Sequence, residues 1–171
     1  MKAIAPLLLP NGYKQIIKTF GNINNYIVLA PDGSEKLRPE FEKENILKLA
    51  LPYPIRLANS SNGNVRTIKC HKLLKDRLGS IFDDIEKRGL ANKITTFGGC
   101  FHFRRKRLGR DLSAHSWGIA IDLNPEANKQ GNVGDMDDGI IEIFKKYEFV
   151  WGGDWSGRSR DPMHFQYCKT R

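Results

Sequence analysis

Two histidines and two aspartates in two short segments of this 171-residue chain are its strongest chemical signal. His115 and Asp122 lie on either side of Gly118, and Asp161 precedes His164 by three residues near the end of the chain. Catalytic zinc takes three protein ligands and keeps a fourth position open. We therefore predict that His115, Asp122 and His164 bind Zn²⁺, although two imidazoles and a carboxylate also suit other divalent ions.

A metal-dependent hydrolase also needs a proton acceptor and a positive group, and the chain offers a candidate for each. Pro162 places Asp161 in a turn before His164, where its carboxylate could take a proton from water and pass it to a leaving amine. Arg104, in a basic run, is the candidate partner for the oxyanion. A buried histidine, a strand-end cap or a turn-opening aspartate would be the structural interpretations. The co-occurrence of these residues beside glycines and small side chains favours catalysis.

Alternating residues predict the strands that would position these ligands. In residues 119–123 large apolar side chains alternate with small ones, and the small-residue face includes a carboxylate. Residues 163–167 alternate in the same way, so His164 and Gln166 should share one face of a second strand. A turn at Gly118 would bring the first imidazole to the same point. The two strands should therefore face one cleft.

Helical spacing of apolar residues predicts the remaining larger elements. Residues 65–90 are expected to form the best helix, because leucine and isoleucine recur there at helical spacing until a glycine. Shorter helices are expected at residues 12–20 and 137–147, and a short strand at residues 26–29.

Length and composition indicate a globular protein of a single domain. The chain is 40% hydrophobic and 27% charged and has enough mass for a core. The first 60 residues carry no motif, so we expect residues 1–64 to be an N-terminal extension packed on a catalytic core of residues 65–171. We expect a monomer. Three cysteines without a CxxC pair indicate buried thiols and no cysteine zinc site.

The N-terminus and the hydropathy bear on location. No run of about 18 apolar residues is present, so no transmembrane segment is expected. Residues 1–10 have a short apolar part, contain Pro6 and lack a small-residue cleavage site. We therefore expect cytoplasmic synthesis without a signal peptide of its own.

The net charge of +9 predicts a polyanionic partner. Nucleic acid, an anionic cell wall and a membrane surface are all candidates. Much of the charge lies in residues 104–107 and at Arg110. No nucleic-acid motif and no interleaved aromatic residues accompany this run, so the charge alone does not select the partner.

The two chemical segments together resemble a known family. The pattern S-x-H-x-x-G-x-A-x-D at residues 113–122, followed by D-x-M-H-F at residues 161–165, resembles zinc peptidases of bacteria and phages. These include D-alanyl-D-alanine carboxypeptidases and L-alanyl-D-glutamate endopeptidases. The resemblance covers roughly residues 65–168. It implies a hedgehog-type α+β fold, in which a central antiparallel sheet carries the metal site and helices flank it.

The resemblance also implies roles for individual residues. The zinc ligands of the family match His115, Asp122 and His164, and its catalytic acidic residue matches Asp161. The segment at residues 98–104 is similar to the one that carries a substrate-binding arginine, which matches Arg104. Ser113 matches a serine that lines the substrate site.

The substrate implied by the resemblance is the stem peptide of peptidoglycan. Aspartate rather than glutamate at position 161 favours the endopeptidase branch, and therefore cleavage of the L-Ala–D-Glu bond, as in phage endolysins that reach the cell wall after release. Removal of the terminal D-Ala is the nearest alternative. A basic nucleic-acid-binding domain without catalysis, or a zinc-binding recognition domain that has lost catalysis, is an alternative of another class. Neither uses Asp161 beside His164, so we expect no nucleic-acid partner.

Overall fold

A six-stranded sheet organises the chain in the computed structural model, which describes residues 4–60, 63–106 and 111–169. The strand order is β4-β3-β5-β6-β8-β7. Neighbouring strands are antiparallel except β3 and β5, which run parallel. With four α-helices in the described residues, the α+β class is confirmed. The sheet is mixed, so the prediction of a wholly antiparallel sheet was wrong for this one pair.

The site-bearing half of the sheet is antiparallel and made of short strands. These are β5 (Thr96–Gly99), β6 (Ala120–Leu123), β8 (His164–Gln166) and β7 (Val150–Trp151). The predicted strand at residues 119–123 is confirmed as β6, and that at residues 163–167 as β8. Such short strands are stable here because β6 and β8 are interior strands with completely buried apolar residues.

The other half of the sheet is a long hairpin of β3 (Ile46–Leu57) and β4 (Asn64–His71). β3 comes from the segment that we expected to be an extension, yet it lies between β4 and β5. It is therefore part of the sheet and not a segment packed on it. The expected division between residues 64 and 65 falls at the start of β4.

The long helix expected at residues 65–90 is wrong in its first part. The structure has β4 to residue 71 and a helix, α3, only at Lys75–Lys87. In β4 the buried residues Ile68 and Cys70 alternate with exposed ones, which is the period of a strand. Because this alternation is only a few residues long, it merges in sequence with the helical spacing that follows.

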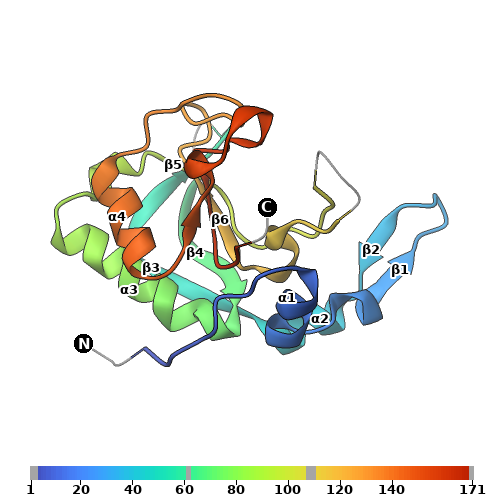
Figure 1. The fold of residues 1–171 in the computed structure, drawn as a ribbon. Coiled ribbons are helices and arrows are strands. Elements are labelled where there is room, and N and C mark those ends of the chain that lie inside the picture. Colours follow the sequence, from blue (N-terminus) through green and yellow to red (C-terminus); the bar gives the residue numbers. More distant parts are fainter. Residues whose placement is uncertain (1–3, 61–62, 107–110, 170–171) are drawn as a thin grey trace.

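The other helices frame the sheet as expected (Figure 1). The two predicted shorter helices are confirmed as α1 (Tyr13–Phe20) and α4 (Asp138–Lys146). α3 packs on β3 and against α4. A further helix, α2 (Pro39–Asn45), leads directly into β3. No helix in the described ranges combines the length and apolar character needed to cross a membrane.

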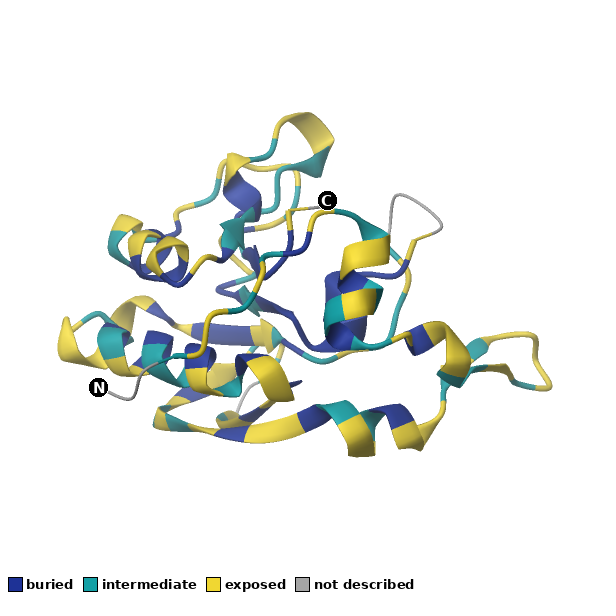
Figure 2. Cartoon of the chain, turned by 60° about the horizontal axis from the view of Figure 1, so that its bottom comes forward, coloured by how far each residue is buried: buried dark blue, intermediate teal, exposed yellow. Residues whose placement is uncertain are grey.

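A small hairpin of β1 (Ile27–Leu29) and β2 (Glu35–Leu37) projects from the body of the molecule. The strand expected at residues 26–29 is confirmed as β1. Figure 2 shows that this arm is mostly exposed, whereas buried residues run through the sheet and the inner faces of the helices. Cys70, Cys100 and Cys168 lie in that buried interior, as predicted.

The N-terminal segment packs against Tyr167 and His71. The Tyr167 hydroxyl donates to the carbonyl of Leu7 over 2.7 Å, and the ring of Phe20 contacts His71 and Tyr167 edge-on. His71 is almost fully buried; burial lowers its pKa to about 4, and its Nε2 lies 3.1 Å from the Phe20 carbonyl. A neutral His71 therefore holds the end of α1 in place and lies apart from the metal-ligand candidates.

Candidate metal centre

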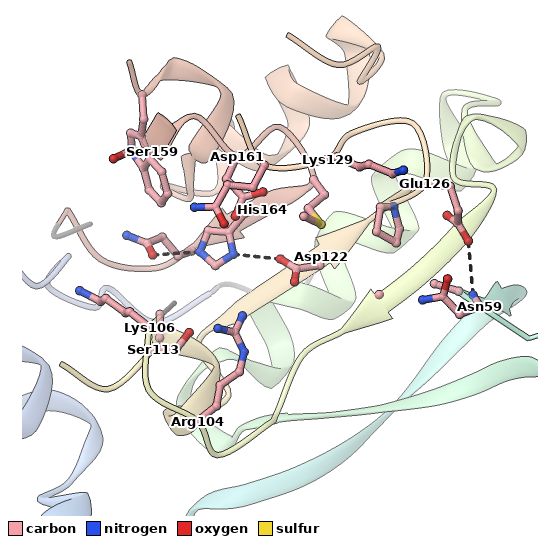
Figure 3. A pocket seen from close by; sticks show the side chains of 18 of the residues that line it. Asn59, Arg104, Lys106, Ser113, Asp122, Glu126, Lys129, Ser159, Asp161 and His164 are labelled. Carbon is pink, nitrogen blue, oxygen red and sulfur yellow. Dashed lines mark hydrogen bonds and ion pairs between the residues drawn. The ribbon is translucent and has the colours of Figure 1, made fainter. Parts of the chain in front are cut away.

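Strands β6 and β8 bring two of the three predicted ligands together. Their register places Asp122 directly opposite His164. Directly opposed residues point to the same face of a sheet. Asp122 Oδ1 and His164 Nδ1 are 2.9 Å apart as a result. Figure 3 shows this pair at the centre of a cleft.

A tight turn brings His115 to the same point. His115 lies in a short 3₁₀ helix, Ala114–Trp117, whose first backbone groups are capped by the Ser113 hydroxyl. Gly118 ends this helix with a φ of 67°, a left-handed conformation that favours glycine. A Cβ at Gly118 would lie only 2.9 Å from the backbone nitrogen of His71. The predicted turn at Gly118 therefore exists, and both conformation and space require glycine there.

The three ligand atoms form a triangle of the right size for zinc. His115 Nε2 is 3.2 Å from Asp122 Oδ1 and 3.2 Å from His164 Nδ1. Ligand atoms about 2.05 Å from a tetrahedral zinc ion lie about 3.3 Å apart. Within the described residues this is the group of histidine and acidic side chains whose geometry could hold a metal ion. The Asp122 side chain is 17% exposed, so the triangle opens toward the cleft.

Hydrogen bonds on the far side of each imidazole leave lone pairs facing the centre of this triangle. His115 Nδ1 lies 2.8 Å from the carbonyl oxygen of Cys100, which can only accept, so this nitrogen carries the proton. Gln166 donates its amide to the Cys168 carbonyl over 3.0 Å, which turns its own oxygen toward His164 Nε2 at 3.0 Å. Nε2 of His164 is therefore the protonated nitrogen. Partners of this kind are typical of metal-bound histidines.

The electrostatics of the group fit a cation at its centre. Burial would raise the pKa of the Asp122 carboxyl, but the imidazoles of His115 and His164 hold it well below its ordinary value. Burial would lower the pKa of His164, but its contacts with Asp122, Gln166 and Asp161 raise it. The lone pairs of the two imidazole nitrogens and the Asp122 carboxylate oxygen lie about 3 Å apart, and they repel one another unless a proton or a metal ion lies between them. The donor set therefore fits Zn²⁺.

Gln166 is a positioning residue for this centre, and its loss should weaken metal binding. We expect Gln166→Leu to lower zinc affinity about 10- to 100-fold, because His164 then loses the acceptor that orients its ring. Gln166→Glu keeps an acceptor and should retain most of the affinity. Competition with a chromophoric chelator measures the zinc affinity of both variants. The control is Gln130→Ala, because Gln130 is another amide residue that lines the cleft. Unchanged affinity in Gln166→Leu would contradict this role.

Asp161 lies beside His164 at the cleft (Figure 3). Its backbone N–H donates to the carbonyl of Gly152 over 2.9 Å, and its own carbonyl accepts from the backbone N–H of His164 over 3.0 Å. A Cβ at Gly152 would overlap the Asp161 carbonyl oxygen. The glycine thus permits the close approach that places Asp161 beside the candidate ligand His164.

The basic run divides between the cleft and the protein surface. Arg104 and Lys106 line the cleft, and Figure 3 shows the Arg104 side chain rising toward Asp122. The backbone N–H of Arg104 donates to the Ser116 hydroxyl, and its backbone carbonyl accepts from the same hydroxyl. These two bonds fix the backbone of Arg104. Arg105 points elsewhere and pairs with Glu35 of β2 over 2.7 Å. Arg107 and Arg110 lie outside the described residues.

Ser113 has a structural and a cleft-lining position at once. Its hydroxyl accepts from the backbone N–H of His115, which helps to hold that imidazole in place. It also lines the cleft, where Figure 3 shows it beside Lys106 and Arg104. His102, in contrast, is exposed and does not line the cleft.

The cleft has a volume of about 840 Å³ and extends to both sides of the ligand triangle. Asn59 and Glu126 lie at one end, and Lys106 and Ser159 lie at the other (Figure 3). Sequence reasoning did not assign these end residues to the site, nor Trp155 in its wall. They lie in loops or, for Ser159, in a short 3₁₀ helix, where no periodicity of the sequence marks them.

Comparison with known proteins agrees with this geometry. A family model described as D-alanyl-D-alanine carboxypeptidase, from a family of zinc peptidases, matches residues 107–167. This match supports a peptidase. The matched segment contains all three ligand candidates and Asp161, whereas Arg104 and strands β3 to β5 precede it. No curated protein and no solved structure matches the chain.

Proposed function

We propose that this protein is a zinc-dependent peptidase that cleaves the L-Ala–D-Glu bond in the stem peptide of peptidoglycan. The observation that carries the proposal is the convergence of His115 Nε2, Asp122 Oδ1 and His164 Nδ1 on one point of an open cleft. A carboxylate and a guanidinium stand beside that point. The peptidase family match over residues 107–167 supports the same chemistry.

Each residue of the site has a task in this proposal. His115, Asp122 and His164 would hold the zinc ion, which would supply Lewis-acid chemistry for the attacking water and the scissile carbonyl. Asp161 accepts the proton of the attacking water and delivers it to the leaving amine. Arg104 places positive charge near the oxyanion and near substrate carboxylates. The Ser113 hydroxyl offers a hydrogen bond to the substrate from the cleft wall.

The shape of the cleft supports an endopeptidase. An enzyme that cuts within a peptide must accommodate chain on both sides of the scissile bond. Here the cleft continues past the ligands toward Asn59 and Glu126 on one side and toward Lys106 and Ser159 on the other. A carboxypeptidase that removes the terminal D-Ala needs an extended cleft on only one side of the scissile bond.

The charge of the chain supports an anionic polymer as the setting. With a net charge of +9, the protein is attracted to polyanions such as an anionic cell wall. We infer that it acts there as a monomer, after release from the cell that made it. Cell-wall binding through charge alone should weaken steeply as salt is added.

A defined substrate tests the proposal. Purified protein with zinc is incubated with a sugar-linked stem peptide, and the products are separated by mass. We expect cleavage between L-Ala and D-Glu, which releases a large peptide fragment, and we expect a chelator to stop it. Release of single D-Ala would instead identify the carboxypeptidase. An intact substrate together with tight, salt-sensitive binding to nucleic acid would contradict peptidase function.

A further inference from the structure

Trp155 differs from the other two tryptophans of the chain. Trp117 donates its indole N–H to the Gly21 carbonyl, and Trp151 donates to the Pro162 carbonyl and packs against the core. In the described part of the chain, no hydrogen bond involves the indole N–H of Trp155, and its ring is not part of the core packing. Its partly exposed ring lines the cleft instead.

The ring of Trp155 lies next to a candidate metal ligand, and hydrogen bonds hold its backbone. Its centroid is 5.6 Å from that of the His164 ring, at an angle of 47°. The backbone N–H of Trp155 donates to the Gly152 carbonyl, and its carbonyl accepts from the Arg160 guanidinium, both over 3.2 Å. A large, partly exposed apolar surface therefore lies beside His164 and outside the core packing. Rigid exposed aromatic rings of this kind are typical binding anchors.

We propose that Trp155 is the binding platform for the amino sugar that carries the stem peptide. The inference rests on the proposed function and names its substrate as glycan-linked peptide rather than free peptide. The apolar C–H face of a pyranose ring stacks on an indole ring. The indole N–H and the hydroxyl of Ser159, which lines the same cleft, suit its polar edge.

The length of the substrate agrees with this placement. One alanine and a lactyl linker separate the sugar from the L-Ala–D-Glu bond, which at about 3.5 Å per unit is roughly 7 Å. The centroid of the indole ring lies 5.6 Å from that of the His164 ring, which is a similar distance. In a D-Ala-releasing reaction the sugar would be several residues farther away, and Trp155 could not reach it. If cleavage depends on the sugar, the bond that is cut must therefore be the L-Ala–D-Glu bond and not the bond to the terminal D-Ala.

The test compares two substrates that differ only in the sugar. One is the stem peptide joined to its amino sugar, and the other is the same peptide with an acetylated N-terminus. For the parent protein we expect kcat/KM to be about tenfold higher with the sugar. In Trp155→Ala the ratio should fall to about one, while Trp155→Phe should keep an intermediate ratio. Arg158→Ala, in the same loop and exposed, should retain the parent ratio.

Zinc affinity is measured on the same variants to separate substrate binding from support of His164. The platform predicts that Trp155→Ala keeps the parent affinity for zinc. A parent ratio near one, or an unchanged ratio in Trp155→Ala, would overturn the platform alone. A ratio that falls together with zinc affinity would make Trp155 a support for His164 and would also overturn it. If the parent cuts neither substrate, the proposed function itself fails.

Discussion

Asp161→Ala should bind zinc as tightly as the parent protein and hydrolyse the sugar-linked peptide at least about 100-fold more slowly. The carboxylate lies next to the metal ligands but is not one of the three atoms of the ligand triangle. Its removal therefore takes away the proton acceptor and leaves the metal ligands in place. The measurement pairs kcat on the defined substrate with zinc affinity from chelator competition.

The matched control for this variant is Asp154→Ala. Asp154 belongs to the same loop, but it is exposed and pairs with Lys145 away from the cleft. Its loss should leave both kcat and zinc affinity near the parent values. Parent-like hydrolysis by Asp161→Ala would remove this residue from the mechanism. It would also revive the interpretation in which Asp161 only opens the turn before His164.

Asp122→Ala should lose zinc binding and activity together. The Asp122 carboxylate contacts both imidazoles, at 3.2 and 2.9 Å, and is the one anionic ligand of the triangle. Loss of a partner outside the ligand set costs metal-binding sites about 10- to 100-fold in affinity, so loss of a ligand should cost more than about 100-fold. Zinc at about 100 times its Kd should raise the Tm of the parent by about 5–10 °C. The variant should show no such rise.

Thermal unfolding with and without zinc measures this effect without any substrate. Asp111→Ala provides the comparison, because Asp111 lines the cleft but does not belong to the ligand triangle. It should keep the zinc-dependent rise in Tm. A zinc-dependent rise that persists in Asp122→Ala would place the metal elsewhere and would sink the proposed function.

The basic run illustrates why sequence alone could not complete the site. The sequence offers neighbouring cations from residue 104 to residue 107 without distinguishing their directions. In the structure Arg104 and Lys106 line the cleft, whereas Arg105 between them pairs with Glu35 on the projecting hairpin. The partner of Arg105 is about 70 residues away in the chain, and no local pattern announces such a contact.

The fold shows the same division between local and distant information. The helices α1 and α4 were predictable because the apolar stripe of each is visible in the spacing of residues within the helix itself. The parallel pairing of β3 with β5 was not, because it joins strands about 40 residues apart through backbone hydrogen bonds that every sequence can make. The break between β4 and α3 was missed, since a brief period of two ran into a period of 3.6.

The amino-acid sequence by itself determined the chemical inventory: the residue types of the candidate ligands, the glycine turn after His115, and the shared face of His164 and Gln166. These follow from local backbone periodicity and from the ligand preferences of metal ions. Only the tertiary structure decided the register that sets Asp122 opposite His164, and the hydrogen bonds that select one nitrogen of each imidazole. It also decided the place of Trp155 beside that centre. Register and side-chain partners arise from packing between distant segments, which leaves no trace in the spacing of residues along the chain.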